Sequence, residues 1–265
     1  MRKILKKLHL YLALVLFIPL VLQGLTGSAM AFRGEISNAI LNYKYDLTAG
    51  ETAAEEDIIA AAQNVVDPEL NPAPFKMPEQ KGTFAKVRFN KKGERKPIAE
   101  VIIDPVSLDI LEVNDPSKNI FRILKKFHED LFLSEIGKNA VGIFGIVMLF
   151  MCVSGLVIWW PKHGMLKRAL TFKFSDTGKK FYRDLHGAFG FWFLIPLTAV
   201  SVTGIYMIYF KTKESSKLWH SIHDGTVIGI YGESLAFAVG LLPLLFSITG
   251  ISLWLLKKKS KRVAN

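Results

Sequence analysis

Four of the six histidines in this chain of 265 residues lie at matching places in two similar stretches of sequence: His9, His128, His186 and His223. A neutral imidazole is a good axial donor to haem iron, and two imidazoles that face one another fill both axial positions. Such a site has no open coordination position, which favours electron transfer over oxygen binding. The residue types therefore suggest haem sites, provided that the fold pairs the histidines.

An internal repeat predicts this pairing. A shift of 177 residues overlays 8–32 on 185–209 and matches His9 with His186. A shift of 95 residues overlays 127–162 on 222–257 and matches His128 with His223. Identical residues of rarer types support both shifts: Pro19 and Pro196, Gly27 and Gly204, Gly155 and Gly250, Trp159 and Trp254, with Ser154 opposite Thr249. We therefore expect two parallel helix–loop–helix repeats related by an axis along the membrane normal.

The elements that carry the histidines are predicted to be membrane helices. The windows without Asp, Glu, Lys or Arg are 8–32, 139–160, 187–210 and 234–256. Each exceeds the roughly 20 residues that a helix needs to cross a bilayer. Pro19 and Pro196 are expected to kink their helices. The stretch "SAMA" (28–31) resembles a cleavage site, so a removable signal peptide is an alternative for the first window. Its length and its match to a later window favour a retained helix.

The charge distribution predicts the orientation of these helices. Residues 1–7, 161–185 and 257–265 hold 16 Lys and Arg against two acidic residues, whereas 33–138 holds 15 basic and 18 acidic residues. The positive-inside rule then places both termini, loop 161–186 and tail 257–265 in the cytoplasm, and places 33–138 and 211–233 outside. The net charge of +11 is thus explained by topology and by contact with the lipid bilayer, and a nucleic-acid partner is not expected.

This topology puts two histidines on each side of the membrane. His9 and His186 lie at cytoplasmic ends of their spans, and His128 and His223 lie just outside theirs, so we expect one haem b in each leaflet. His220 is an alternative ligand, because it lies three residues before His223. His163 has no match in the repeat and is expected to be a solvated loop residue. The alternatives for the four repeated histidines are interfacial packing or a proton relay.

Other residues suit the same interpretation. Gly27 and Gly204 could give room to an external macrocycle, and Gly155 and Gly250 to an internal one. The expected partners of haem propionates are basic: Lys6, Lys7, Lys180 and Arg183 inside, and Arg122, Lys125 and Lys126 outside. Trp159, Trp160 and Trp254 are expected to be interfacial anchors, with electron relay as a minor alternative. The single cysteine, Cys152, is expected to be a packing residue.

The polar segment 33–138 is long enough to form a small domain of its own. A helix is expected within 49–66, an irregular proline-rich stretch over 67–82, strands over 84–90 and 98–105, and a third strand over 108–115. The predicted fold is therefore a membrane all-α bundle of four transmembrane helices. A small α+β domain, with a sheet and one or two helices, is inserted between the first and the second.

Several stretches resemble the PepSY-associated transmembrane helix family, notably "KKLHLYLALVLFIPLVLQGLTGSAMAFRGEI", "FHEDLFLSEIGKNAVGIFGIVMLFMCVSGLVIWWPK", "RDLHGAFGFW" and "IHDGTVIGIYG". The insert's "AEVIIDPVSLDILEV" resembles a PepSY domain. The resemblance implies a bacterial inner-membrane haem protein with a periplasmic PepSY domain, and its histidines fall on the four that the repeat selects. Ser134 departs from the small or Gly residue that usually follows "LFL".

The resemblance implies a ferric-siderophore reductase. The leading hypothesis is a di-haem conduit that takes electrons from an unidentified donor and reduces a ferric siderophore or other ferric chelate in the periplasm. Two alternatives stay open. One is a non-enzymatic accessory or regulatory protein, and the other is a haem protein that passes electrons between quinol and a protein partner.

Overall fold

The structure is a computed structural model that describes residues 1–75, 77, 83–94, 96–161, 165–210, 212 and 215–263. The chain divides into two compact units. One contains Met1–Ala31 together with Lys125–Asn265, and the other is Phe32–Leu124. The second unit ends before the expected boundary at 138, because α4 (Ile120–Asp130) contributes its second half to the first unit.

The first unit is helical. In chain order it contains α1 (Arg2–Ala31), the end of α4, α5 (Ser134–Trp159), α6 (Leu166–Ala169), α7 (Gly178–Trp192), α8 (Leu194–Tyr209), α9 (Ser216–His223), a short 3₁₀ turn (Thr226–Ile228) and α10 (Ile230–Val263). Within the described part of the chain, α1, α5 and α10 are long and apolar enough to cross a membrane, and α7 with α8 makes a fourth span if the bent pair counts as one. Apolar side chains such as Val15, Ile143 and Ile195 are exposed on these helices, as expected of lipid-facing surfaces. The chain is a multi-pass membrane protein.

The third span differs from the expected single kinked helix. Helix α7 ends at Trp192 and α8 begins at Leu194, and the two are bent by 62°. Pro196 therefore lies in the first turn of α8, where a missing N–H breaks no intrahelical hydrogen bond. Its counterpart Pro19 lies within α1, which continues as one helix on both sides.

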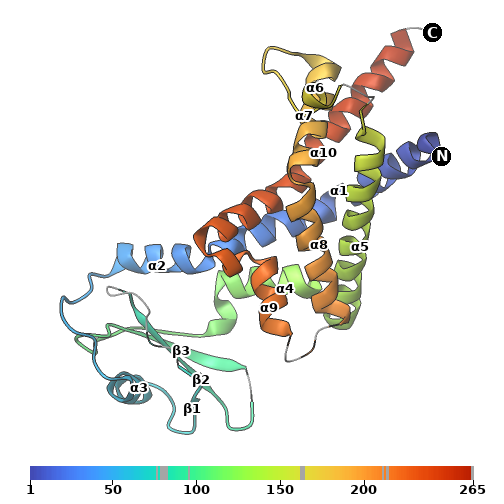
Figure 1. Ribbon diagram of the computed structural model, residues 1–265. Coiled ribbons are helices and arrows are strands. Elements are labelled where there is room, and N and C mark those ends of the chain that lie inside the picture. The colour runs from blue at the N-terminus through green and yellow to red at the C-terminus, as the bar shows by residue number, and fades with distance from the viewer. Residues whose placement is uncertain are drawn as a thin grey trace. The chain divides into compact units, whose positions relative to one another are not determined.

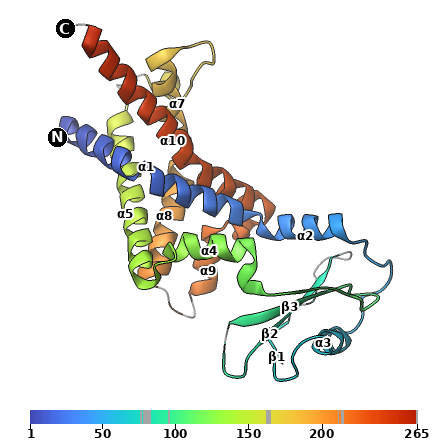
Figure 2. The same ribbon diagram turned by 180° about the vertical axis from the view of Figure 1, so that it is seen from behind.

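Small residues let the helices pack closely. Helix α1 lies along α10, and α5 lies along α8 (Figure 1, Figure 2). A Cβ atom added to Gly24 would lie 2.2 Å from the carbonyl oxygen of Gly240, and the Ser28 hydroxyl donates to the carbonyl of Phe237 at 2.8 Å. Close approach at small residues is a common mode of helix association in membranes. Gly145, which matches Gly240 in the repeat, has the equivalent place where α5 meets α8.

The second unit is an α+β domain. Its described strands form one antiparallel sheet in the order β1 (Asn71–Pro72), β2 (Ala85–Asn90), β3 (Pro97–Ile103) and β4 (Ile110–Asn114). The last three were expected, whereas β1 lies in the stretch expected to be irregular. Ile58 and Ala62 of α3 (Glu55–Gln63) pack on one face of the sheet, and Leu41 of α2 (Arg33–Lys44) packs on the other. With α2, α3 and the start of α4, the insert has more helix than the one or two expected.

A buried carboxylate organises one loop of this domain. The side chain of Asp104 is 3% exposed and accepts backbone N–H groups of Thr48 at 2.7 Å, Val106 at 2.8 Å and Ser107 at 3.4 Å. Burial alone would raise the pKa of Asp104, but these hydrogen bonds to the ionised form outweigh it and hold the pKa below its ordinary value. The charged form therefore stabilises the loop.

Candidate functional site

Two of the repeat-matched histidines face one another. His128 lies near the end of α4 and His223 is the last residue of α9, and their ring centroids are 6.3 Å apart with 60° between the planes. An imidazole nitrogen lies about 2.0–2.1 Å from a bound transition metal and about 1.1 Å from its own ring centre, so two axial imidazoles have centres roughly 6.2–6.4 Å apart. The spacing of this pair therefore suits one iron between the two rings.

The turns that follow α4 and α9 place these histidines. After α4 the backbone is left-handed at Leu131, Phe132 and Ser134, with φ of 51°, 61° and 54°. The carbonyl of Asp130 then approaches α5 so closely that a Cβ atom on Gly137 would lie 1.6 Å from its oxygen.

The second repeat builds the same turn with glycines. Gly225 and Gly229 have φ of 83° and 60°, and a Cβ atom on Gly232 would lie 1.9 Å from the oxygen of Gly225. Gly232 matches Gly137 and Gly229 matches Ser134, so equivalent residues make equivalent contacts in both halves.

Each imidazole of this pair bonds to a threonine through Nδ1. Nδ1 of His128 lies 3.0 Å from Oγ1 of Thr26, and Nδ1 of His223 lies 2.9 Å from Oγ1 of Thr203. A backbone carbonyl adds a second contact: Val200 for His223, at 3.1 Å, and Gln23 for His128. Nε2 is the nitrogen left to bind a metal.

Both imidazoles are neutral at physiological pH. Burial lowers the pKa of His128 to about 4, and the neighbouring His223 lowers it further. Burial also lowers the pKa of His223 to about 4, with a smaller contribution from His220. A neutral imidazole is the form that binds iron.

The other two histidines have the matching arrangement near the opposite ends of the spans. Nδ1 of His9 on α1 lies 2.8 Å from Oγ of Ser154 on α5, and Nδ1 of His186 on α7 lies 2.7 Å from Oγ1 of Thr249 on α10. The two imidazoles are close enough to interact electrostatically, and the ring of Phe246 lies 5.0 Å from that of His186. The structure thus brings together the same pairs that the repeat predicts.

A glycine next to each hydroxyl residue makes room for the ring. Added Cβ atoms would lie 3.1 Å from Cε1 of His128 at Gly27 and 3.3 Å from Cε1 of His223 at Gly204. The corresponding distances are 3.5 Å from His9 at Gly155 and 3.9 Å from His186 at Gly250. Each of these glycines therefore lies beside the edge of an imidazole, and the room that they were expected to give to a macrocycle stays a prediction.

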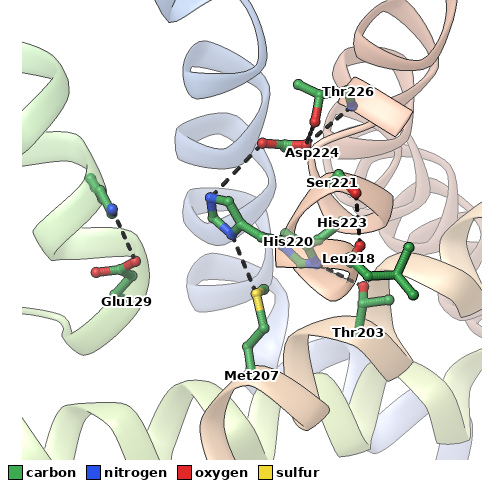
Figure 3. Close-up of polar contacts among 10 residues, drawn as sticks. Glu129, Thr203, Met207, Leu218, His220, Ser221, His223, Asp224 and Thr226 are labelled. Atoms are coloured by element: carbon green, nitrogen blue, oxygen red, sulfur yellow. Dashed lines mark hydrogen bonds and ion pairs between the residues drawn. The ribbon is translucent and has the colours of Figure 1, made fainter. Parts of the chain in front are cut away.

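His220 has a different environment from His223. Its Nδ1 lies 3.4 Å from the sulfur of Met207, its Nε2 lies 3.9 Å from a carboxylate oxygen of Asp224, and its side chain is 42% exposed (Figure 3). It shares α9 with His223, but the ring that faces His128 is that of His223. His163 lies outside the described residues.

The basic residues expected to bind propionates already have partners in several cases. Lys126 pairs with Asp130 at 2.8 Å and Lys125 with Glu129 at 3.7 Å. The same holds for Lys180 with Asp176, Arg183 with Asp184, and Arg122 with the carbonyl of Pro97. Lys6 and Lys7 are exposed. No contact in the described residues singles out any one of these basic residues as a partner of a propionate.

Trp159 lies closer to the histidines than its expected role as an interfacial anchor implies. Its ring packs over Gly187, the residue after His186, and lies 4.9 Å from the ring of Phe191. The hydroxyl residues of the site were also missed as functional residues. The only signal for them is a Ser-Gly or Thr-Gly pair that recurs at matching positions of the repeat: 26–27, 154–155, 203–204 and 249–250.

The donor set suits haem. Each pair supplies two imidazole nitrogens, and among the described residues no group of three or more His, Cys, Asp or Glu side chains could hold a metal ion. Haem brings four equatorial nitrogens of its own and needs only the two axial ligands that each pair provides. The residues that would hold it are His128 with His223, and His9 with His186.

Fold and site together define a helical membrane protein with an additional α+β unit, in which histidines from different helices meet in pairs. The family model for the PepSY-associated TM region matches residues 6–221, and the chain belongs to this family. No curated protein matches the chain.

Proposed function

We propose that this protein is a di-haem electron-transfer protein that carries electrons across the bacterial inner membrane and reduces ferric siderophores or other ferric chelates in the periplasm. His9 and His186 would hold the haem on the cytoplasmic side, and His128 and His223 the haem on the periplasmic side. The observation that carries the proposal is the pairing itself, with the ring centres of His128 and His223 6.3 Å apart and Nδ1 of all four rings occupied.

The residues of the chain supply what such a cofactor needs. The imidazoles present Nε2 as axial donors, the apolar helices exclude water, and the basic cytoplasmic loops agree with the orientation in which 33–138 is periplasmic. Bound haem would supply reversible one-electron transfer. Reduction of the substrate lowers the charge of its iron, so hard oxygen ligands bind it less tightly and the metal would be released.

An absorption spectrum of the purified protein, oxidised and then reduced, is the first test. Soret and α bands after expression with sufficient haem are expected, with two haems per chain. His9→Ala and His128→Ala should each remove about half of the haem. A colourless protein would favour the non-enzymatic alternative, and variants that both keep all of their haem would refute the assignment of ligands.

A second candidate, oxidation of membrane quinol, has one observation in its favour. Phe172, Phe189, Trp192 and Phe193 line an open surface pocket of about 270 Å³ at the break between α7 and α8. Phe189 lies one turn from His186 on α7. A flat apolar ring fits an aromatic-lined pocket of this kind. Two mixtures distinguish the candidates: oxidised protein with quinol, and dithionite-reduced protein with ferric siderophores. Reduction of the protein by quinol, without reoxidation of the reduced protein by any ferric siderophore, would favour the second candidate.

A further inference from the structure

We propose that the hydroxyls of Thr26, Ser154, Thr203 and Thr249 are positioning groups that set the tautomer of the four histidines, and that the cytoplasmic pair depends on its hydroxyls more than the periplasmic pair does. This inference rests on the proposed haem function. It goes beyond that function in assigning four residues that are not ligands, and in assigning unequal roles to the two pairs.

The hydrogen bonds of the hydroxyls determine which atom donates. Each hydroxyl has one hydrogen and lies within bonding distance of a carbonyl about one turn earlier in its own helix. Thr26, Thr203 and Thr249 donate to the carbonyls of Leu22, Ala199 and Leu245, all at 2.8 Å, and Ser154 donates to that of Met151 at 3.3 Å. A hydroxyl that gives its hydrogen to a carbonyl can only accept from the imidazole. Nδ1 therefore carries the ring hydrogen, and Nε2 keeps the lone pair that binds iron.

The periplasmic pair has a second hydrogen-bond acceptor, a backbone carbonyl, that favours the same tautomer as the threonine hydroxyl. Nδ1 of His223 lies 3.1 Å from the carbonyl oxygen of Val200, and the carbonyl of Gln23 bonds to His128. A carbonyl oxygen accepts and cannot donate, so Nδ1 of His223 would stay protonated even without Thr203. The interaction with the carbonyl of Gln23 also favours a protonated nitrogen on His128.

In the cytoplasmic pair, the described hydrogen-bond partners of Nδ1 are the two hydroxyls alone. Among the described residues, the hydrogen bond of His9 is to Ser154 and that of His186 is to Thr249, and no carbonyl shares either Nδ1. Ser154 is 1% exposed and Thr249 is 2% exposed, so water cannot replace them without repacking of the helices. Without the hydroxyl, Nδ1–H would be a buried donor with no partner, and the tautomer that carries hydrogen on Nε2 and cannot bind iron would gain population.

The same bonds tune the electron affinity of the site. A donated Nδ1–H bond makes an imidazole a stronger donor to iron and stabilises the ferric state. Loss of a hydroxyl should therefore move the reduction potential in the positive direction. The shift should be larger at the cytoplasmic haem, because the periplasmic imidazoles keep their carbonyl.

Matched variants of Thr249 and Thr203 test this inference in the full-length protein. Valine keeps the shape of threonine and removes the hydroxyl, whereas serine keeps the hydroxyl. Thr249→Val should weaken cytoplasmic haem binding about tenfold or more and raise the potential of that haem. Thr203→Val should change the periplasmic haem by a clearly smaller factor. Thr249→Ser and Thr203→Ser should resemble the parent protein. The readouts are haem per chain and a spectroelectrochemical titration, with the two haems assigned from His9→Ala and His128→Ala.

Equal effects of the two valine variants, or no effect of Thr249→Val on potential and haem content, would overturn the inference. If Thr249→Val does not fold, as judged by size-exclusion chromatography, Ser154→Ala removes the matching hydroxyl with a smaller change of volume and should act on the same haem. The haem content of the parent protein distinguishes a failure of the proposed function from a failure of this inference. A parent without haem refutes the proposed function and this inference together, whereas a di-haem parent with insensitive variants refutes the inference alone.

Discussion

Replacement of Gly137 by alanine tests whether the turn between α4 and α5 places His128. The added Cβ atom would lie 1.6 Å from the carbonyl oxygen of Asp130 and 2.5 Å from its carbonyl carbon. Real Cβ atoms essentially never approach another heavy atom closer than 3.0 Å. The Asp130 carbonyl must therefore retreat by about 1.4 Å or more, which is beyond a relaxation of side chains alone.

This displacement reaches the histidine because Asp130 follows His128 by two residues on α4. Ligands of a functional site must be held within about 0.5 Å of their productive positions, so a shift of about 1.4 Å should misplace the ring. We expect Gly137→Ala to lose most of the haem proposed to bind His128 and His223, which would be about half of the total. Overpacking should also lower the free energy of unfolding by about 1–3 kcal/mol. Gly232→Ala should do the same to His223, since its Cβ atom would lie 1.9 Å from the oxygen of Gly225.

Gly190→Ala is the matched control. Gly190 lies within α7, and no described atom approaches its added Cβ within 4 Å. This variant should keep both haems and gain up to about 1 kcal/mol of stability from the higher helix propensity of alanine. The assay is haem per chain from the reduced absorption spectrum, together with Tm in detergent. If Gly137→Ala and Gly232→Ala both keep two haems and the spectrum of the parent, the turn does not position the histidines and the reasoning fails.

Three further outcomes follow from the structure. Ser134→Gly should raise Tm, because a non-glycine residue at a φ of 54° costs about 1 kcal/mol and the matching Gly229 has a φ of 60°; an unchanged or lower Tm would contradict this. His220→Ala should keep both haems while His223→Ala loses one, and the reverse result would make His220 the ligand. Asp104 has a lowered pKa in the folded domain, so its contribution to stability is present above the unfolded value of about 4 and is lost as the pH falls through the lower folded value. Pepsin cleavage of the insert should therefore rise over this acidic range in the parent protein and vary less with pH in Asp104→Asn, and identical profiles would count against the role of the carboxylate.

The spans and the pairs of histidines were predictable because each has a strong signal in the sequence. Runs of more than 20 uncharged residues have few explanations other than a membrane helix. Histidine, glycine and proline at fixed offsets are harder to match by chance than leucine or isoleucine, so the repeat alone predicts the pairing of His128 with His223. Strands β2, β3 and β4 were predictable from alternating side chains, which their pattern of burial reproduces in β2.

Other features could not be predicted because they depend on packing between elements. Helix α2 buries only Leu41, so the segment has no apolar periodicity to recognise. Helix α4 buries no residue completely and is rich in charge, so it was assigned to the insert, although its end belongs with the membrane helices through His128. The break at Phe193 was displaced from the expected kink, because Pro196 is accommodated in the first turn of a new helix rather than in the interior of an old one.

The hydroxyl contacts show why the repeat is informative about the site as well as about the fold. His9 bonds to Ser154 and His128 bonds to Thr26, so both contacts lie within the first repeat, and both equivalents lie within the second. Each pair of neighbouring imidazoles, in contrast, joins the two repeats: His128 with His223, and His9 with His186. A single repeat therefore carries one oriented imidazole of each pair and cannot complete either pair. If the four histidines bind haem as proposed, the recurring Ser-Gly and Thr-Gly pairs let each copy hold its own rings in the correct tautomer and leave room for their edges. The second copy would then supply the opposite ligand.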